Sequence, residues 1–339
     1  MKKRIFACYF LVLCLLFVEL MGLIIYCTIG DKYSENLEKV ESKIEEREPV
    51  LEVPIIEKSS LFMVGDVLIH GAVYADADMG NGYDFTPMLE EFEEIVASHD
   101  LSFYNQESIL GGSQLGVSSY PRFNSPDEVG DAFREVGFNL VSLANNHTLD
   151  KGEQAILNSK HYWDSHHIYT AGSYSSWNDR NTIRIKEVNG IRYVMFAYTD
   201  HTNGLLVPSG KEYLVDVYSE AKVKADVETV RDQVDVVLVS MHWGDEYSHS
   251  VSNRQRQIAS QLASLGVDII IGHHPHVVEP IEYLGDTLVI YSLGNFLSAQ
   301  RGVEKLTGLM VSLDIVKTTY QGVVDISLNN IKVGLTYTQ

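Results

Sequence analysis

The chain has 339 residues, a formal net charge of −20 and 45% hydrophobic residues, which excludes a collagen-like, low-complexity or wholly disordered protein. Lys and Arg total 26 against 46 Asp and Glu, so we expect no nucleic-acid partner, because binding to that backbone depends on clustered cations. The three cysteines are Cys8, Cys14 and Cys27, so no disulfide is expected in the rest of the chain.

The N-terminus has the pattern of a membrane segment. Met1-Lys2-Lys3-Arg4 precedes an apolar run from Ile5 to Ile29 that contains one charge, Glu19. A helix needs about 20 apolar residues to cross a bilayer, and no small-x-small cleavage site is evident. We therefore predict an uncleaved signal anchor over residues 1–30. It would place a single-pass protein in the cell membrane, with its domain on the extracytoplasmic side. A cleaved signal peptide is the alternative.

Residues 31–58 differ from the segments on either side and predict a charged stalk. Apolar residues from Tyr33 to Ile44 fall on one helical stripe. Pro49 and Pro54 then prevent the helix from continuing. A short coiled-coil seam is the alternative.

Residues 59–339 predict one α/β domain. Short apolar runs alternate with amphipathic segments, which indicates strands and helices in repetition. The expected strands are 61–64, 101–104, 139–143, 192–196, 235–240, 267–271 and 288–291, and the expected helices are 87–98, 126–136, 153–165, 219–233 and 254–265. The stretch 306–333 alternates without a helical pattern and predicts closing antiparallel strands.

Side chains that bind metals follow the ends of five predicted strands, where open α/β sheets bind their ligands. Two divalent cations about 3.5–4 Å apart require a bridging carboxylate with further oxygen and imidazole ligands. Imidazole with carboxylate favours Mn, Fe or Zn over Ca. The candidates are Asp66 and His70; Asn105 and Glu107; Asn145, Asn146, His147 and Asp150; His242; and His273, His274 and His276.

Each segment also has an ordinary structural explanation. Asp66 could cap a turn, Asn105–Glu107 could form a plain loop, and Asn145–His147 could cap the next helix. His242 could be a packed histidine. The His274–His276 segment is the sharpest signal, because an extended step before proline places alternate side chains on one side; an exposed polar loop is its alternative. Recurrence at five strand ends favours a metal site.

These motifs together resemble the CapA family of poly-γ-glutamate capsule biosynthesis proteins. The resemblance covers residues 60–300 and includes Gly65-Asp66, Asn105-x-Glu107, Asn145-Asn146-His147-x-x-Asp150, His242-Trp243-Gly244, Gly272-x-His274-Pro275-His276 and Ser292-Leu293-Gly294-Asn295-Phe296. The family is in turn similar to calcineurin-like metallophosphoesterases. The resemblance therefore implies a four-layered αββα sandwich with a two-metal site.

The resemblance also implies a role for each residue. Asp66 would bind the first metal, Glu107 would bridge the two ions, and Asn146 would bind the second. His147 would contact the substrate or act as general acid. His242, His274 and His276 would complete the two ligand sets, and His70, Asn105, Asn145, Asp150 and His273 would be ligands or neighbours of ligands. Arg122 could bind the substrate, or it could be an ordinary surface arginine.

The sequence departs from the superfamily pattern at three of these positions. Gly272 is followed by two histidines, and His273 occupies a position without a ligand role in that pattern. That pattern begins Asp-x-His, whereas His70 lies four residues after Asp66, so ligation by His70 is in doubt. The bridging Asp is replaced by Glu107, which adds a methylene. Phosphatase activity therefore does not follow from the resemblance alone.

Three functions are open at this stage. The first is a metal-dependent hydrolase that acts on a phosphoester, or on a link in an anionic cell-surface polymer such as poly-γ-glutamate. The second is a non-catalytic polymer-binding subunit whose anchor packs against capsule synthase or transporter subunits. Glu19 favours such a contact, because an intramembrane carboxylate requires a partner, although it could also be an off-centre polar residue. The third is a structural metal domain with a relic site.

Overall fold

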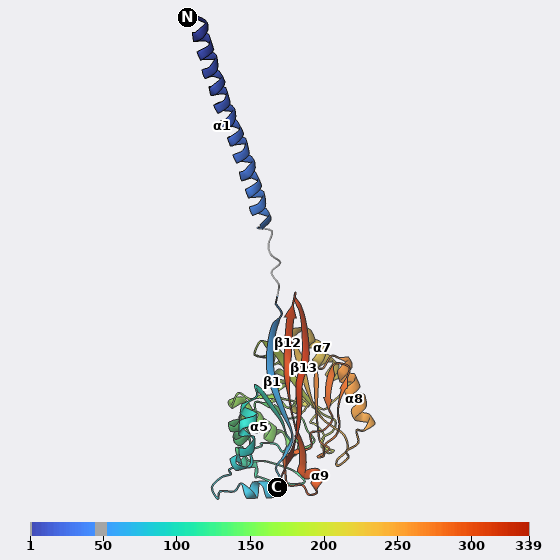
Figure 1. Cartoon of the computed structure of the whole chain (residues 1–339). Coiled ribbons are helices and arrows are strands. Elements are labelled where there is room, and N and C mark those ends of the chain that lie inside the picture. Colours follow the sequence, from blue (N-terminus) through green and yellow to red (C-terminus); the bar gives the residue numbers. More distant parts are fainter. Residues whose placement is uncertain (1, 45–52, 339) are drawn as a thin grey trace. The chain divides into compact units, whose positions relative to one another are not determined.

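The computed structural model describes residues 2–44 and 53–338, which form two compact units divided between Val53 and Pro54. The first unit is a single helix, α1 (Lys2–Ile44) (Figure 1). Over Phe10–Glu41 its mean hydropathy reaches 2.6, so its length and composition suffice to cross a membrane. The helix continues unbroken into the predicted stalk, and residues 45–52 of that stalk lie outside the described residues.

The second unit contains two β-sheets. The first has the strand order β13-β12-β1-β2-β3-β4, and β11 pairs additionally with β1. The second has the order β5-β6-β7-β8-β10-β9. The first sheet comprises β1 (Ile55–Leu68), β2 (Leu101–Gln106), β3 (Leu140–Ser142), β4 (Tyr169–Ala171), β11 (Asn295–Ser298), β12 (Thr307–Tyr320) and β13 (Val323–Tyr337). The second comprises β5 (Lys186–Val188), β6 (Ile191–Thr199), β7 (Val236–His242), β8 (Ile269–His273), β9 (Ile281–Leu284) and β10 (Thr287–Ile290).

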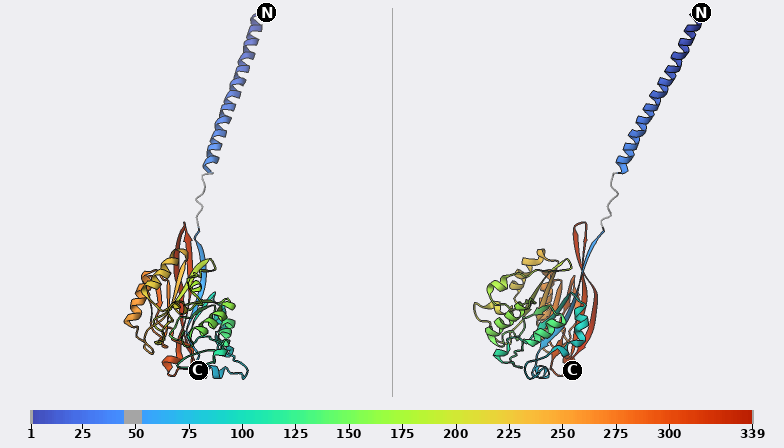
Figure 2. Two further views of the ribbon diagram at one scale, coloured as in Figure 1. Left: turned by 180° about the vertical axis from the view of Figure 1, so that it is seen from behind. Right: turned by 90° about the vertical axis from the view of Figure 1, so that its left-hand side faces the viewer.

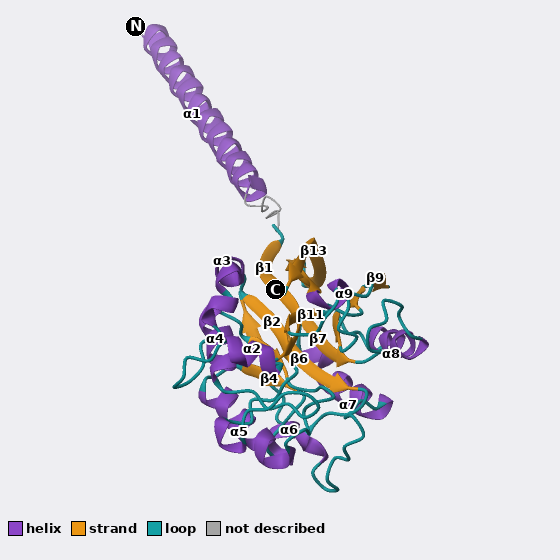
Figure 3. Cartoon of the chain, turned by 90° about the horizontal axis from the view of Figure 1, so that it is seen from below, coloured by secondary structure: helices purple, strands orange, loops and turns teal. Residues whose placement is uncertain are grey.

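Helices cover the outer face of each sheet. Figure 3 shows α4 and α5 on one side of the strands and α7 and α8 on the other. The helices of this unit are α2 (Gly71–Asp76), α3 (Glu93–Ala97), α4 (Glu128–Val136), α5 (Gly152–Ser165), α6 (Trp177–Asn181), α7 (Glu220–Val230), α8 (Asn253–Ser264) and α9 (Val303–Leu306).

Three separate hydrophobic cores define the layers. One core lies between the sheets and joins residues such as Met63 and Phe103 of the first sheet to Leu238 and Ile269 of the second. The other two cores lie between each sheet and its helices. Each sheet is therefore covered on both faces, which explains its continuously apolar parallel strands. The arrangement is the predicted αββα sandwich, and the fold prediction is confirmed.

The C-terminal residues form antiparallel strands, as the sequence predicts. β12 pairs with β1 from Ile55↔Thr319 to Met63↔Val311, and β13 pairs with β12 along nearly its whole length. Figure 2 shows this long hairpin beside β1. Because β1 is held on one edge by β2 and on the other by β12 and then, from Asp66 on, by β11, its carboxyl end is fixed at the middle of the sheet.

The helix predicted over residues 87–98 is wrong in its extent. The structure has two short 3-10 turns, Thr86–Met88 and Glu90–Phe92, followed by α3. None of the three begins with a side chain that accepts a hydrogen bond from its first turn.

Candidate metal centre

The candidate residues meet where strands of both sheets end. Asp66 of β1 lies beside Asn105 of β2 in the first sheet, and His242 of β7 lies beside His273 of β8 in the second. Gly65 permits a close approach between β1 and the Gly294 backbone just before β11, because a Cβ at Gly65 would overlap the carbonyl oxygen of Gly294. The parallel strands therefore bring residues that are far apart in sequence to one edge of the sandwich.

Asp66 is a fully buried carboxylate surrounded by nitrogen donors. Its Oδ1 accepts a hydrogen bond from Asn105 Nδ2 at 2.8 Å and lies 3.3 Å from His273 Nδ1. Its Oδ2 accepts the backbone N–H of His274 at 3.2 Å and lies 3.3 Å from His276 Nδ1. Burial would raise the pKa of Asp66, but hydrogen bonds and charge from His273 and His276 outweigh it and hold that pKa well below its usual range. Asp66 is therefore ionised and oriented.

Glu107 is fully buried, and neither of its carboxylate oxygens has a hydrogen-bond partner among the described residues. Its Oε1 lies 3.6 Å from His242 Nε2 and 3.6 Å from His276 Nε2. Burial raises the pKa of Glu107 well above its usual range, with His276 opposing that effect. A buried carboxyl without partners is costly unless a cation compensates it. Glu107 therefore has the environment of a carboxylate placed to bind metal between two groups of ligands.

A second cluster forms on one side of Glu107. His242 Nε2 lies 2.9 Å from Asn146 Oδ1 and 3.1 Å from His274 Nδ1. Burial, with the charge of His274 adding to it, lowers the pKa of His242 well below its usual value. Burial, with His276 and His201 adding to it, lowers the pKa of His274 to about 3. Both rings are therefore neutral, which is the form that binds metals.

His276 lies on the other side of Glu107. Its Nδ1 is 3.0 Å from Asn295 Oδ1. Burial lowers the pKa of His276, but the carboxylates of Glu107 and Asp66 outweigh it and raise that pKa to about 9. Ligands of a tetrahedral ion with bonds near 2.1 Å lie about 3.4 Å apart. Asp66 Oδ2 lies 3.3 Å from His276 Nδ1, whereas Glu107 Oε1 lies 3.6 Å from His276 Nε2. The two carboxylates therefore face different nitrogens of this ring, and the Glu107–Nε2 spacing is the one that fits two ligands of a single ion. One ligand atom each from Glu107, His274 and His276 lies within 4.8 Å of the others, so these three residues could hold a metal ion.

The backbone at His274-Pro275-His276 differs from the predicted extended step, and that prediction is wrong. His274 has φ 99° and His276 has φ 58°, both in the left-handed region. Their ring centroids nevertheless lie 5.9 Å apart. The turn, and not an extended strand, directs both rings into the cluster.

The remaining predicted residues surround this cluster. Asn105 and His273 flank Asp66, with His273 Nδ1 3.3 Å from Asp66 Oδ1 and His273 Nε2 without a hydrogen-bond partner among the described residues. Asn145 shapes its own loop, because its Nδ2 donates to the Gln106 carbonyl and its Oδ1 accepts from the His147 N–H. His70 lies apart, with its Nδ1 3.0 Å from the Leu68 carbonyl oxygen.

A polar cavity of about 460 Å³ adjoins the cluster. His147 lines it, and its Nδ1 lies 2.7 Å from Asp150 Oδ2. Asp150 Oδ2 also accepts the Phe123 backbone N–H at 2.7 Å, and the Phe123 ring packs edge-on against His147. The imidazole is therefore fixed in position and orientation. The other lining residues are Leu68, His70, Tyr120, Pro121, Arg122, Phe123, Asp150, Asn203, Leu205, Glu246, Tyr247, His276 and Gln300.

Sequence reasoning missed two residues beside the cluster. His201 Nε2 lies 3.3 Å from His274 Nε2, and Asn203 Oδ1 accepts a hydrogen bond from Asn146 Nδ2 at 3.3 Å. Both follow β6, so the strand-end rule that located the other candidates also applies to them. Asn295, which contacts His276, belongs to the Ser292–Phe296 motif, but the motif alone predicts no role for it.

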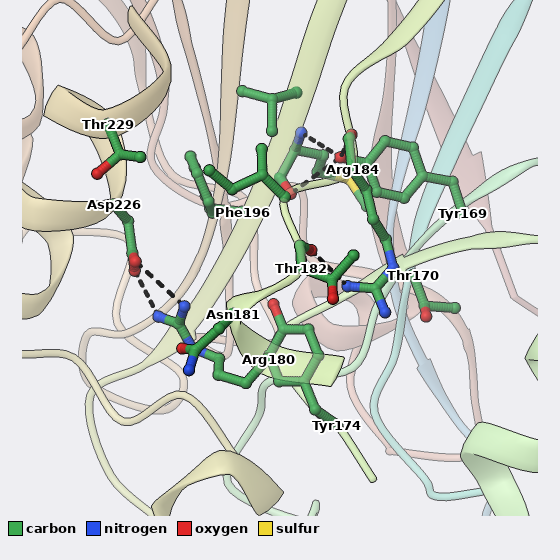
Figure 4. A pocket seen from close by; sticks show the side chains of 13 residues that line it. Tyr169, Thr170, Tyr174, Arg180, Asn181, Thr182, Arg184, Phe196, Asp226 and Thr229 are labelled. Carbon is green, nitrogen blue, oxygen red and sulfur yellow. Dashed lines mark hydrogen bonds and ion pairs between the residues drawn. The ribbon is translucent and has the colours of Figure 1, made fainter. Parts of the chain in front are cut away.

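A second cavity of about 170 Å³ lies away from this cluster, between β4, β6 and α7 (Figure 4). Its two arginines are paired: Arg180 forms a two-pronged contact with Asp226, and Arg184 pairs with Asp179. Arg180 also donates to Asp216 at 2.8 Å. Because these cations are already paired with carboxylates, the network holds α6 against α7 and offers little free charge to an anion.

The layers define the αββα fold of the metallophosphoesterase type, and the candidate ligands lie at one edge of it. The model of the family described as bacterial capsule synthesis protein PGA_cap matches residues 60–300. The chain belongs to this family, and the resemblance noted from the motifs is confirmed.

Among curated proteins, the chain is 35% identical over 178 residues to the PGA biosynthesis protein CapA of Bacillus subtilis, covering 49% of this chain and 44% of that protein. It is 28% identical over 260 residues to the capsule biosynthesis protein CapA of Bacillus anthracis, covering 72% and 61%. The matches thus span about half the length of these relatives.

Among solved structures, a candidate 5′-nucleotidase from Staphylococcus aureus in complex with α-ketoglutarate superimposes with a TM-score of 0.51 and 16% identity, over 83% of this chain and 55% of that one. The calcineurin-like phosphoesterase YfkN of Bacillus subtilis aligns with a TM-score of 0.47 and 12% identity, over 84% and 91%. The first of these likenesses supports the fold alone.

Proposed function

We propose that this chain is a membrane-anchored, extracytoplasmic hydrolase that uses two divalent metal ions. The observation that carries the proposal is Glu107, a fully buried carboxylate with two unpartnered oxygens between two groups of imidazole and oxygen ligands. A carboxyl that served only the fold would have hydrogen-bond partners. The donor set fits a metal, and it contains no thiolate.

The side chains divide into two ligand sets that share Glu107. Asp66 and His276 would hold one ion, and Asn146, His242 and His274 would hold the other, in agreement with the Glu107–His276 spacing and the short distances within the second set. Imidazole with carboxylate and amide oxygen favours Mn, Fe or Zn. Two such ions, when bound, lower the pKa of a water and neutralise the anionic group under attack.

The chain's own residues supply the proton chemistry beside these ligands. Asp150 Oδ2 accepts the Nδ1 proton of His147 and so fixes the ring with its Nε2 available to a substrate. His147 would then hold a proton for the leaving group, as a general acid does. Arg122 lines the same cavity and would bind an anionic group of the substrate.

The substrate that we propose is a phosphoester, or an acyl or amide link, in an anionic cell-surface polymer, with poly-γ-glutamate as the first candidate. The names of the two Bacillus relatives, which specify PGA and capsule biosynthesis, support this choice. The apolar part of α1 supports an anchor in the cell membrane, and the basic residues that precede it support an extracytoplasmic domain.

A second candidate is a non-catalytic polymer-binding subunit of a capsule synthase or export complex. Glu19 favours it, because this carboxylate lies within the candidate membrane span and such a group requires a protein partner. A Mycobacterium tuberculosis relative, 25% identical over 195 residues, is named a probable polyglutamine synthesis accessory protein. That name describes the relative as an accessory protein, and it supports the proposal of a non-catalytic subunit for this chain.

One experiment separates these functions. The full chain is purified in detergent, its metal content is measured by elemental analysis, and phosphodiester turnover is followed with added Mn²⁺. About two metals per chain with turnover supports the hydrolase, and Glu107→Gln, the control, should lose both. Metal without turnover on phosphodiester or poly-γ-glutamate supports the binding subunit. A chain that takes up no metal after loading refutes the proposed site.

A further inference from the structure

The loop that follows β6 contacts two of the proposed ligands of one ion. Thr199, the last residue of β6, pairs with His242 of β7, so the loop begins beside the metal cluster. The Asp200 N–H donates to the His242 carbonyl oxygen at 2.9 Å, and the Asp200 carboxylate accepts a hydrogen bond from Arg254 Nη2 at 2.9 Å. The start of the loop is therefore fixed to β7 and to α8.

Internal hydrogen bonds hold the rest of this loop in one shape. Thr199 Oγ1 donates to the His201 carbonyl oxygen at 2.7 Å. Thr202 Oγ1 donates to the Leu205 carbonyl oxygen at 2.6 Å, and the Leu205 N–H donates back to the Thr202 carbonyl oxygen at 2.9 Å. Asn203 lies between them with φ 50°, a left-handed conformation that asparagine tolerates better than most residues. The loop can therefore position the side chains that it carries.

The first of these side chains, His201, meets the far side of the His274 ring. Nδ1 of His274 faces His242 Nε2 at 3.1 Å, whereas its Nε2 faces His201 Nε2 at 3.3 Å. A histidine that binds metal through one nitrogen carries a proton on the other, and that proton needs an acceptor. His201 Nε2 is placed to accept it when His274 binds through Nδ1. In that state His201 carries its own proton on Nδ1, so the long contact of 3.5 Å from the Asn203 N–H to His201 Nδ1 gives way, because a neutral imidazole accepts through one nitrogen only.

The second side chain, Asn203, meets the amide of Asn146. Asn203 Oδ1 accepts a hydrogen bond from Asn146 Nδ2 at 3.3 Å. That contact turns the opposite atom of the amide, Oδ1, toward His242 Nε2, 2.9 Å away. An amide binds a cation through its oxygen, so this orientation of Asn146 presents the ligand atom to the proposed metal position.

We infer that His201 and Asn203 are positioning residues, which hold His274 and Asn146 in the orientation that binds the second metal ion. The inference rests on the proposed function. Neither residue belongs to the motifs that identify the family here. Both lie on one short loop, so a single element orients two ligands of the same ion. Asn203 also lines the cavity beside His147, which links that ligand set to the space for the substrate.

The variants separate the orienting contact from the shape of the loop. His201→Ala removes the acceptor, whereas His201→Gln keeps an acceptor oxygen on a side chain of similar reach. Asn203→Gly removes the amide but tolerates the left-handed backbone. The matched control is His161→Ala, an exposed histidine on α5.

The test is Mn²⁺ binding to the metal-free full chain in detergent, measured by calorimetric titration, with the visible spectrum of the Co²⁺-loaded chain as a second readout. Loss of a contact that orients a ligand typically weakens metal affinity about 10–100-fold. We expect His201→Ala and Asn203→Gly to weaken the second Mn²⁺ by at least about tenfold and to change the Co²⁺ spectrum. His201→Gln and His161→Ala should bind as the wild type does.

Two results would overturn the inference, and they can be told apart. If the wild type binds two ions and His201→Ala keeps the same second affinity and Co²⁺ spectrum, the positioning role is wrong while the proposed function stands. If the wild type takes up no second ion, the proposed function fails and the positioning role fails with it.

Discussion

Replacement of Glu107 by glutamine gives the sharpest test of the shared-carboxylate geometry. Its Oε1 lies 3.6 Å from a histidine of each ligand set, so one substitution should weaken both ions. A metal that binds only the folded chain stabilises it by about 2.7 kcal/mol at 100 times its Kd. For a domain of this size, that corresponds to about 5 °C in Tm. Two such ions give about 5.4 kcal/mol, or about 10 °C. We expect the wild type to gain this increment with Mn²⁺ and Glu107→Gln to gain almost none.

The assay is thermal unfolding of both proteins in EDTA and in saturating Mn²⁺. Without metal, the two should unfold within about 1 kcal/mol of each other, because glutamine has nearly the same volume and burial disfavours the charged carboxylate in any case. Glu246→Gln is the control, because it changes a carboxyl group that lines the cavity but lies outside the ligand sets. The same Mn²⁺-dependent rise in Tm for Glu107→Gln as for the wild type would refute the reasoning.

Three further predictions follow from other contacts. Asp150→Asn removes the carboxylate that accepts the His147 Nδ1 proton. This variant should lower kcat about 10²–10⁴-fold and leave the metal content unchanged. A normal kcat in steady-state assays would contradict the role of the His147–Asp150 pair. Gly65→Ala would place a Cβ against the Gly294 carbonyl oxygen. It should lower the free energy of unfolding, measured with urea, by about 1–3 kcal/mol. An unchanged free energy of unfolding would disprove the close approach of the two backbones. Burial raises the pKa of Glu279 to about 7 from an ordinary 4.5, so stability should fall as pH rises from about 4.5 through about 7. Glu279→Gln should remove this slope in unfolding curves, and an unchanged slope would show that another group causes it.

Much of the fold could be predicted because each layer leaves a local mark in the sequence. The buried strands are continuously apolar, as in Val236–Val239 of β7, and α8 begins with the capping box of Ser252 and Gln255. β4 left no such mark, because Tyr169-Thr170-Ala171 is not a continuous apolar run, whereas the equally short β3 lies within the mostly apolar stretch 139–143. Its place is fixed by pairing with β3, which is a long-range contact.

The candidate site was predictable as a set of residue types but not as a geometry. The strand-end rule gathered Asp66, Glu107, His242 and His274, because parallel strands end at one edge. The distance of Glu107 from two histidines depends on how the two sheets pack, and no local pattern encodes that. His201 follows the end of β6, so the strand-end rule covers it, but it was missed because it stands as a single histidine in a loop, without a second metal-binding side chain of a motif beside it.

The left-handed turn at His274 and His276 limits which ligands this site can acquire by mutation. A side chain with a Cβ pays about 1–2 kcal/mol in that conformation, and only histidine, asparagine and aspartate adopt it with any frequency. A cysteine or glutamate at either position would add this backbone cost to any change in metal chemistry. The backbone itself, and not only the side chains, therefore favours nitrogen and oxygen donors over a thiolate at these two positions.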